Sequence, residues 1–148
     1  MKSIFNKSII SSLVITAIIM AVVSQVTSCT EDVPETERVT SILTSHSWKV
    51  STVTVGGTDQ TSLFTGFTIS FTGTNYNPTN GGLVWPSSST WTFKDDTAKV
   101  LVRGDGLEVK LNEVTETSLK MELTWNKSTL GPGRISSISG VHIFSMTN

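Results

Sequence analysis

From Ser47 to the end of the chain, apolar and polar residues alternate in short runs, and this alternation constrains the fold most strongly. Residues 107–114 show it clearly, because Leu107, Val109 and Leu111 share one face of an extended chain and polar residues lie between them. A period of two is typical of a β-strand with one buried face. The pattern predicts eight strands, over residues 47–55, 67–71, a short one around Tyr76, 90–93, 98–103, 107–114, 119–125 and 135–146, with a bulge at Gly140 in the last.

Tight turns such as Gly56-Gly57 and Gly104-Asp105-Gly106 separate most of these strands, and no helical pattern among them is long enough for a parallel crossover. Consecutive antiparallel pairing is therefore predicted. Open sheet edges invite aggregation, and closure into a barrel removes them. We expect an all-β fold, a single eight-stranded antiparallel up-and-down β-barrel, whose interior would be filled by side chains or hold one small ligand.

A short helix is predicted before the first strand. Glu35 and Glu37 would lie in its first turn, where the helix dipole favours negative charge. A helix of this length is marginal by itself, so its apolar stripe must lie on the barrel. The helical spacing that defines the stripe is carried by Val39, Ile42, Leu43 and His46.

The N-terminus has the features of a secretory signal peptide: Lys2 and Lys7, an apolar run over 9–23, and small residues before a cysteine. The run is shorter than the roughly 20 apolar residues of a spanning helix, which disfavours the alternative of a retained membrane anchor. Val26-Thr27-Ser28-Cys29 resembles the lipobox of bacterial lipoproteins. That resemblance implies cleavage after Ser28 and a diacylglycerol on the sulfur of Cys29.

The predicted organisation is a removed signal peptide over 1–28, a lipidated tether over 29–36 and a barrel domain over 37–148. The lipid on Cys29 is the expected membrane contact. Thr30, rather than aspartate, follows the cysteine, which by resemblance to other lipoproteins favours the outer membrane. Glu31 and Asp32 resemble a short acidic tag for surface display, and the periplasmic face and the cell surface both remain open.

Removal of the first 28 of the 148 residues leaves 120, enough for one domain, which we expect to be a monomer. The formal net charge of −1 becomes −3 because Lys2 and Lys7 are lost, and nothing resembles a basic stripe for nucleic acid. Without Cys29 the domain has no cysteine for a disulfide. A membrane-spanning barrel is disfavoured by charged residues expected on the outer face: Lys99, Arg103, Glu108, Lys110, Lys120 and Glu122.

The order of motifs from residue 39 to 146 resembles the small lipocalin-like lipoproteins of the bacterial envelope. A short helix precedes His46-Ser47-Trp48, then come Phe-Thr-Ile-Ser-Phe over 67–71, Trp85-Pro86 after a glycine-rich loop, and Thr-Trp-Thr-Phe over 90–93. The segments 117–119, 133–134 and 139–140 fit the same pattern. The resemblance implies a barrel, but lipocalins carry Gly-x-Trp where this chain has His46-Ser47-Trp48, so the barrel floor is expected to be packed differently.

Catalytic and metal-binding motifs are absent from the sequence, so we expect no enzymatic activity, no metal and no cofactor. The sequence has two histidines, His46 and His142, but it has no Gly-x-Ser-x-Gly motif that would supply a nucleophilic serine. His46 is expected to pack rather than act as a base. Asp95, Asp96 and Asp105 lie in predicted hairpin turns, where aspartate bonds its own backbone.

Aromatic residues are the candidates for ligand binding, although the same residues would serve equally as a filled core. Trp85 lies in a loop too long for a tight turn and could be a lid, an exposed partner contact or a plug. His142 faces inward if Phe144 does, and outward if Val141 and Ile143 face inward. The candidate ligand-binding residues are Trp48, Phe67, Ile69, Phe71, Trp85, Trp91, Phe93, Leu123, His142 and Phe144.

Two functions follow from these expectations. The first is a lipid-anchored envelope lipoprotein whose barrel binds a small, mostly apolar ligand. The alternative is a solid barrel that docks an envelope protein or glycan through its outer face or through the loop that carries Trp85.

Overall fold

A computed structural model of the chain describes residues 32–126 and 139–148. The predicted signal peptide with Ser28, the lipidation site Cys29 and the first part of the last predicted strand, from Ile135, lie outside the described residues. Residues 33–148 form one compact unit. Its elements are α2 (Glu35–Ser45), β1 (Ser47–Val55), β2 (Thr58–Asp59), the 3₁₀ helix η1 (Thr61–Phe64), β3 (Thr68–Phe71), β4 (Asn75–Thr79), β5 (Ser89–Phe93), β6 (Val100–Arg103), β7 (Glu108–Val114), β8 (Ser118–Trp125) and β9 (Gly140–Thr147).

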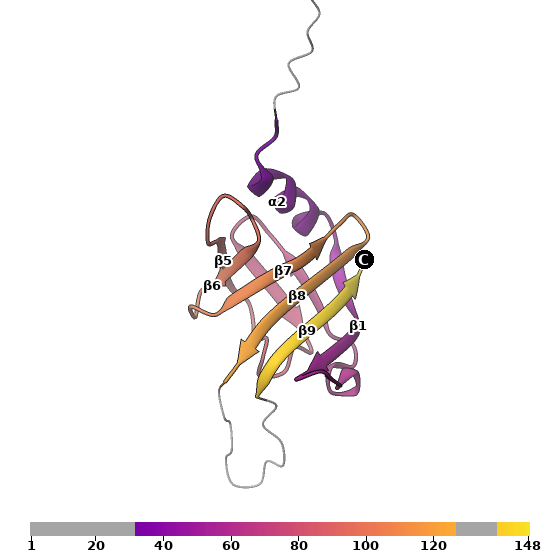
Figure 1. Ribbon diagram of the computed structural model, residues 1–148. Helices are drawn as coiled ribbons and strands as arrows, with labels where there is room; N and C mark the ends of the chain where they lie inside the picture. The colour runs from indigo at the N-terminus through magenta and orange to yellow at the C-terminus, as the bar shows by residue number, and fades with distance from the viewer. Residues whose placement is uncertain (1–31, 127–138) are drawn as a thin grey trace, which may run out of the picture. The chain divides into compact units, whose positions relative to one another are not determined.

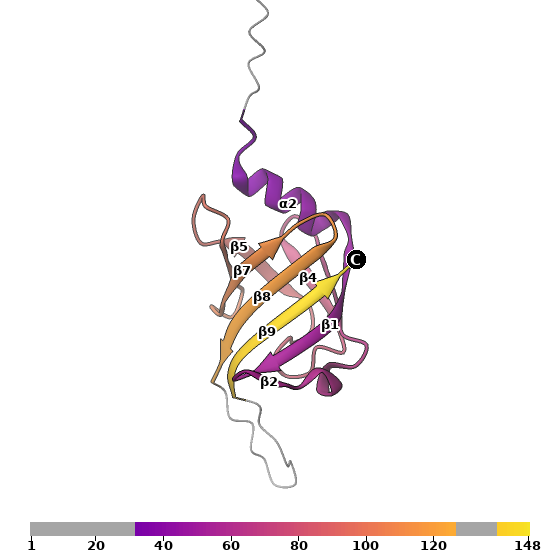
Figure 2. The ribbon, with the colours of Figure 1, turned by 45° about the vertical axis from the view of Figure 1, so that its right-hand side comes forward.

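Eight of the strands close into an antiparallel barrel, as predicted (Figure 1). Each strand from β3 to β8 pairs with the next strand in the chain, and β1 closes the ring by pairing with both β3 and β9. The two residues of β2 form a short additional pair with the end of β1. Figure 2 shows β7, β8, β9 and β1 side by side on one wall of the barrel.

The strand positions agree with the alternation, but the predicted bulge is wrong. Gly140 starts β9 and pairs with Trp125, and the β8–β9 register is continuous from there. The register shifts instead at Ser51, between Val50 and Thr52 of β1, and at Asn112 of β7. A bulge places one extra residue in one strand. Neither Ser51 nor Asn112 differs from its neighbours in a way that marks a bulge in the sequence.

Helix α2 lies across one end of the barrel (Figures 1 and 2). It buries Val39, Ile42 and Leu43, the predicted stripe, and carries Glu35 and Glu37 in its first turn. His46 was expected on this stripe but lies just beyond the helix in extended backbone. The Trp48 indole N–H donates to the Leu43 carbonyl at 3.2 Å, and this carbonyl is among those that a helix end leaves unpaired. Trp48 therefore joins the helix to the barrel.

The outer wall carries most of the charged residues expected there. Lys94 pairs with Glu108 at 2.7 Å, and Lys110 pairs with Glu122 at 3.1 Å. Arg103 is the exception, because it is 3% exposed. No helix within the described ranges is long and apolar enough to cross a membrane.

Candidate functional site

Four aromatic side chains fill the barrel interior toward the end away from α2, and we call them the aromatic cluster: Phe64, Phe67, Trp85 and Phe144. All four are buried, at no more than 3% exposure. The ring centroids of Phe64 and Phe144 are 5.1 Å apart, those of Phe67 and Phe144 are 5.5 Å apart, and Trp85 lies about 6 Å from both Phe67 and Phe144. These rings come from η1, the residue before β3, the loop over 80–88 and β9. The cluster therefore joins two strands of the barrel, β3 and β9, to η1 and to the loop over 80–88.

Trp85 enters the barrel from a loop with special backbone geometry. Asn80 and Gly82 have positive φ angles of 56° and 59°, and the Trp85 N–H donates to the Gly81 carbonyl at 3.1 Å. A Cβ on Gly81 would lie 2.4 Å from the Trp85 Cβ, so only glycine fits beneath the indole. Of the three readings of Trp85, lid, exposed contact and plug, the structure shows the plug, with the side chain 2% exposed.

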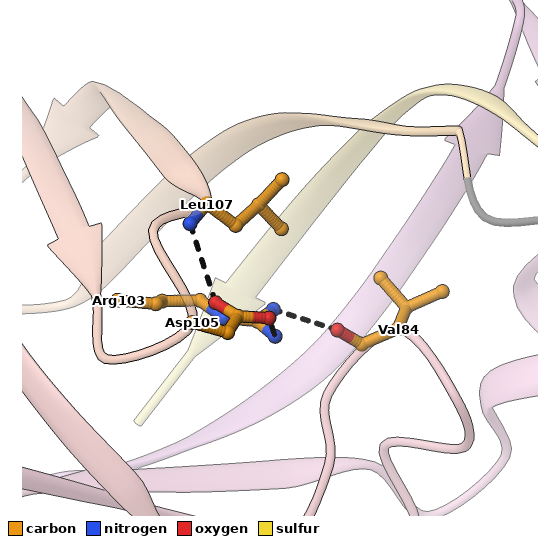
Figure 3. Close-up of polar contacts among 4 residues, drawn as sticks. All are labelled: Val84, Arg103, Asp105 and Leu107. Atoms are coloured by element: carbon orange, nitrogen blue, oxygen red, sulfur yellow. Dashed lines mark hydrogen bonds and ion pairs between the residues drawn. The ribbon is translucent and has the colours of Figure 1, made fainter.

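Arg103 is a buried charge at the end of β6, and Figure 3 shows its contacts. Its Nη1 donates to the Val84 carbonyl at 2.7 Å, and its Nη2 pairs with the Asp105 carboxylate at 2.9 Å. The Arg103 guanidinium carbon lies 5.0 Å from the Trp85 ring centroid and 5.8 Å from that of Tyr76. Asp105 also accepts the Leu107 N–H at 3.2 Å. Arg103 therefore holds the loop at two points, the backbone carbonyl of Val84 and the ring of Trp85.

The expectation that Arg103 faces outward is wrong, and the strand period explains why. Leu101 and Arg103 are two residues apart in β6 and share a face, and Leu101 is 1% exposed. The expectation rested on charge, which favours solvent, rather than on this parity. The Asp105 carboxylate, the Val84 carbonyl and the two rings offset part of the cost of burial.

Buried polar atoms differ in whether they have a hydrogen-bond partner, and those without one lie in or beside the aromatic cluster. Trp48 Nε1 donates to the Leu43 carbonyl, and Trp91 Nε1 donates to the Thr72 carbonyl at 3.0 Å. Four other buried polar atoms have no hydrogen-bond partner within residues 32–126 and 139–148. They are Tyr76 Oη, Trp85 Nε1, Arg103 Nε and His142 Nε2.

Tyr76 contributes a neutral phenol to this region. Its ring lies edge-on to Trp85, with centroids 5.5 Å apart. Burial raises the pKa of the Tyr76 phenol above its usual 10.0, so the hydroxyl keeps its proton at neutral pH. The Arg103 charge and then Ser89 act in the opposite direction on that pKa, but Ser89 forms no hydrogen bond of normal geometry with Tyr76 Oη.

His142 faces inward, which resolves the alternative left open by the sequence. It is fully buried, stacks on Phe144 with centroids 6.0 Å apart, and meets the edge of Phe64 at 6.1 Å. Its Nδ1 lies 3.0 Å from the Gly140 carbonyl, which can only accept, so a neutral His142 carries its proton on Nδ1. Burial lowers the pKa of His142 below 6.5. The lone pair is then on Nε2, which is buried and has no hydrogen-bond partner among the described residues.

The structure places the predicted ligand-binding residues on the inner face of the barrel. Nine of the ten are buried, and Phe93 is half-buried against the core. Phe67, Trp85 and Phe144 belong to the aromatic cluster, and His142 contacts two of its rings, whereas Trp48 bonds the end of α2 and Phe71, Trp91 and Phe93 contact one another.

Sequence reasoning missed three residues of the site: Phe64, Tyr76 and Arg103. Tyr76 and Arg103 could have been found from strand parity, because each lies on an inward position of a predicted strand. Phe64 lies in η1, between two predicted strands, where the sequence has no period to follow.

Groups of three or more His, Cys, Asp or Glu side chains that could hold a metal ion are not found in the described part of the chain. The turn aspartates bond backbone instead: Asp95 accepts the Thr97 N–H at 2.9 Å. A scan against protein-family models and a search of curated proteins found no match to this chain.

Proposed function

We propose that this chain is a lipid-anchored protein of the bacterial cell envelope whose barrel binds a small, mostly apolar ligand at the aromatic cluster. One observation carries the ligand-binding part. The polar atoms that lack a partner among the described residues gather around this cluster, whereas the indole N–H groups near α2 are paired. An unpaired buried polar group costs about 1–3 kcal/mol, and a bound molecule that pairs it removes that cost.

Trp85 is then a displaceable plug. It lies on a loop rather than a strand, and its indole N–H is unpaired within the described ranges. A ligand that enters between the loop and Phe144 replaces ring contacts with its own apolar body. Its polar end pairs groups that protein atoms leave unpaired.

The anchor part of the proposal rests on Val26-Thr27-Ser28-Cys29. Cleavage before Cys29 and lipidation of its sulfur would hold the barrel at the outer membrane, at the periplasmic face or at the cell surface. In cell fractionation, the unaltered chain is expected with membranes, and Cys29→Ser is expected in the soluble fraction or as the uncut precursor. A processed Cys29→Ser protein that stays with membranes would place the anchor elsewhere.

Ligand binding is tested by intrinsic tryptophan fluorescence. The full chain is titrated with a fatty alcohol, a sterol and a quinone, and at least one is expected to give a saturable change. Phe64→Leu alters the aromatic cluster and should weaken that binding, whereas Phe93→Leu, on the far side of Trp91, should not. Linear changes with every compound, equal in both variants, would contradict the ligand-binding part.

A second candidate is a solid barrel that docks an envelope protein or glycan through its outer face. The packing of Trp85 against Phe67 and Phe144 favours it, because that packing fills the interior. The outer wall carries a hollow of about 200 Å³ lined by Leu107, Glu108, Lys110, Glu122, Leu123 and Thr124. Docking there predicts that Lys110→Glu abolishes capture of a partner from envelope extracts while ligand titrations stay linear.

A further inference from the structure

Three of the four unpaired atoms belong to side chains that lie against one another. Arg103 lies over the rings of Trp85 and Tyr76, and those two rings contact each other edge to face. Arg103 Nε and Trp85 Nε1 can only donate a hydrogen bond, and the neutral Tyr76 phenol has one O–H to donate. Within the part of the chain that the structure describes, none of these three donors has an acceptor within hydrogen-bond reach.

The Arg103 guanidinium is also positively charged, so a partner for these donors should carry negative charge. The Arg103 side chain is 1% exposed, whereas its carboxylate partner Asp105 is 32% exposed and shares its charge with solvent. The Val84 carbonyl and the two rings supply only dipoles and quadrupoles. A cation in such a site favours a negatively charged group that also accepts hydrogen bonds, because charge-assisted bonds are roughly twice as strong as neutral ones.

Resting on the proposed function, we propose that the polar end of the ligand is a carboxylate held by Arg103, Trp85 and Tyr76. A carboxylate has two oxygens with about four lone-pair sites and no proton to donate, so it can accept all three N–H and O–H groups. An ammonium end brings donors and a positive charge, and Arg103 repels it. A hydroxyl end can accept two of the three donors at most and carries no charge.

The test compares three ligands of equal chain length, decanoate, 1-decanol and decylammonium, each below its micelle concentration. Isothermal titration calorimetry on the full chain measures each dissociation constant. Decanoate is expected to bind at least tenfold more tightly than decanol, and decylammonium most weakly. Tyr76→Phe removes one donor and no other atom, and should weaken decanoate binding about tenfold while leaving decanol binding within twofold.

Two further variants keep the result interpretable. Arg103→Met should remove the preference for decanoate over decanol, and if it fails to fold, Tyr76→Phe alone decides. Trp91→Phe is the matched control, because its indole N–H is paired with Thr72 and should leave the preference intact. Equal binding of decanoate, decanol and decylammonium would overturn the carboxylate site and leave the proposed function standing. Absence of binding by all three, together with linear titrations of the sterol and quinone, would overturn both.

Discussion

Replacing each buried tryptophan by phenylalanine separates paired from unpaired indole N–H groups by their effect on stability. Trp48 and Trp85 are 0% and 2% exposed, so Trp48→Phe and Trp85→Phe remove the same atoms from similarly buried sites. Their losses of apolar transfer energy and their cavity terms are therefore similar and largely cancel in the comparison. Two differences remain: the hydrogen bond of Trp48, and the Arg103 guanidinium over the Trp85 ring, a contact that a phenylalanine ring keeps in weaker form.

The first difference can be given a magnitude from the contacts. Trp48→Phe leaves the Leu43 carbonyl without the indole donor 3.2 Å away, in a buried site, which costs about 1–3 kcal/mol. Trp85→Phe removes a donor that has no acceptor in the described ranges, so it strands no partner. We expect the free energy of unfolding of Trp48→Phe to be lower than that of Trp85→Phe by about 1–3 kcal/mol.

Urea unfolding of the full chain, followed by far-ultraviolet circular dichroism without added ligand, measures both values. Equal slopes in urea for the two variants show that the same surface unfolds, so that the midpoints can be compared. Trp91→Phe should lose less stability than Trp48→Phe, because the Thr72 carbonyl that loses its donor belongs to an exposed residue and can bond water instead. If Trp85→Phe loses as much stability as Trp48→Phe, the Trp85 N–H is paired in solution, and the ligand-binding proposal loses the observation that carries it.

Three other substitutions test the same structure. Gly81→Ala should lower the thermal midpoint and disturb Trp85, because its Cβ would lie 2.4 Å from that of Trp85, whereas Gly73→Ala, with open space around the added Cβ, should not. Burial lowers the pKa of His142 below 6.5, so the unfolded chain takes up a proton at higher pH than the folded chain does. The free energy of unfolding should therefore fall as the pH drops from 6.5 toward the pKa of the folded state. Above pH 6.5 it should be insensitive to this group. His142→Leu should remove that part of the pH dependence, measured by urea unfolding between pH 7 and 5. Lys94→Ala breaks an exposed ion pair with Glu108 and should change the thermal midpoint less than Gly81→Ala does.

The period of two was sufficient to predict the barrel because it is carried by many residues at once. In β7, Val109 and Leu111 are buried while Glu108 and Lys110 are exposed, and the same alternation repeats in β8. Shifting such a strand by one residue would expose its whole apolar face. The local departures were not predictable in the same way: the extra residues at Ser51 and Asn112 have no compositional mark.

The candidate site was harder to predict, because it combines residues from loops and strand ends. The sequence identified Trp85 but left its position open, since a loop has no period that sets the direction of a side chain. Arg103 was assigned to the outside because of its charge, although its parity with Leu101 predicts the inside. In β6, where charge and parity disagree, Arg103 follows parity, and Asp105, the Val84 carbonyl and two aromatic rings surround its charge.

That disagreement is also the reason to assign a function to Arg103 rather than a structural role alone. A buried ion pair is often no more stabilising than apolar side chains of similar volume, so the Arg103–Asp105 pair is weak support for the fold. A methionine at position 103 could pack against Tyr76 and Trp85 without stranding an Nε–H group. The arginine adds a charge and a donor beside the rings of Tyr76 and Trp85, whose own polar atoms also lack a partner among the described residues. The proposed recognition of an acceptor-bearing ligand would account for that arrangement, beyond the contacts by which Arg103 holds the loop.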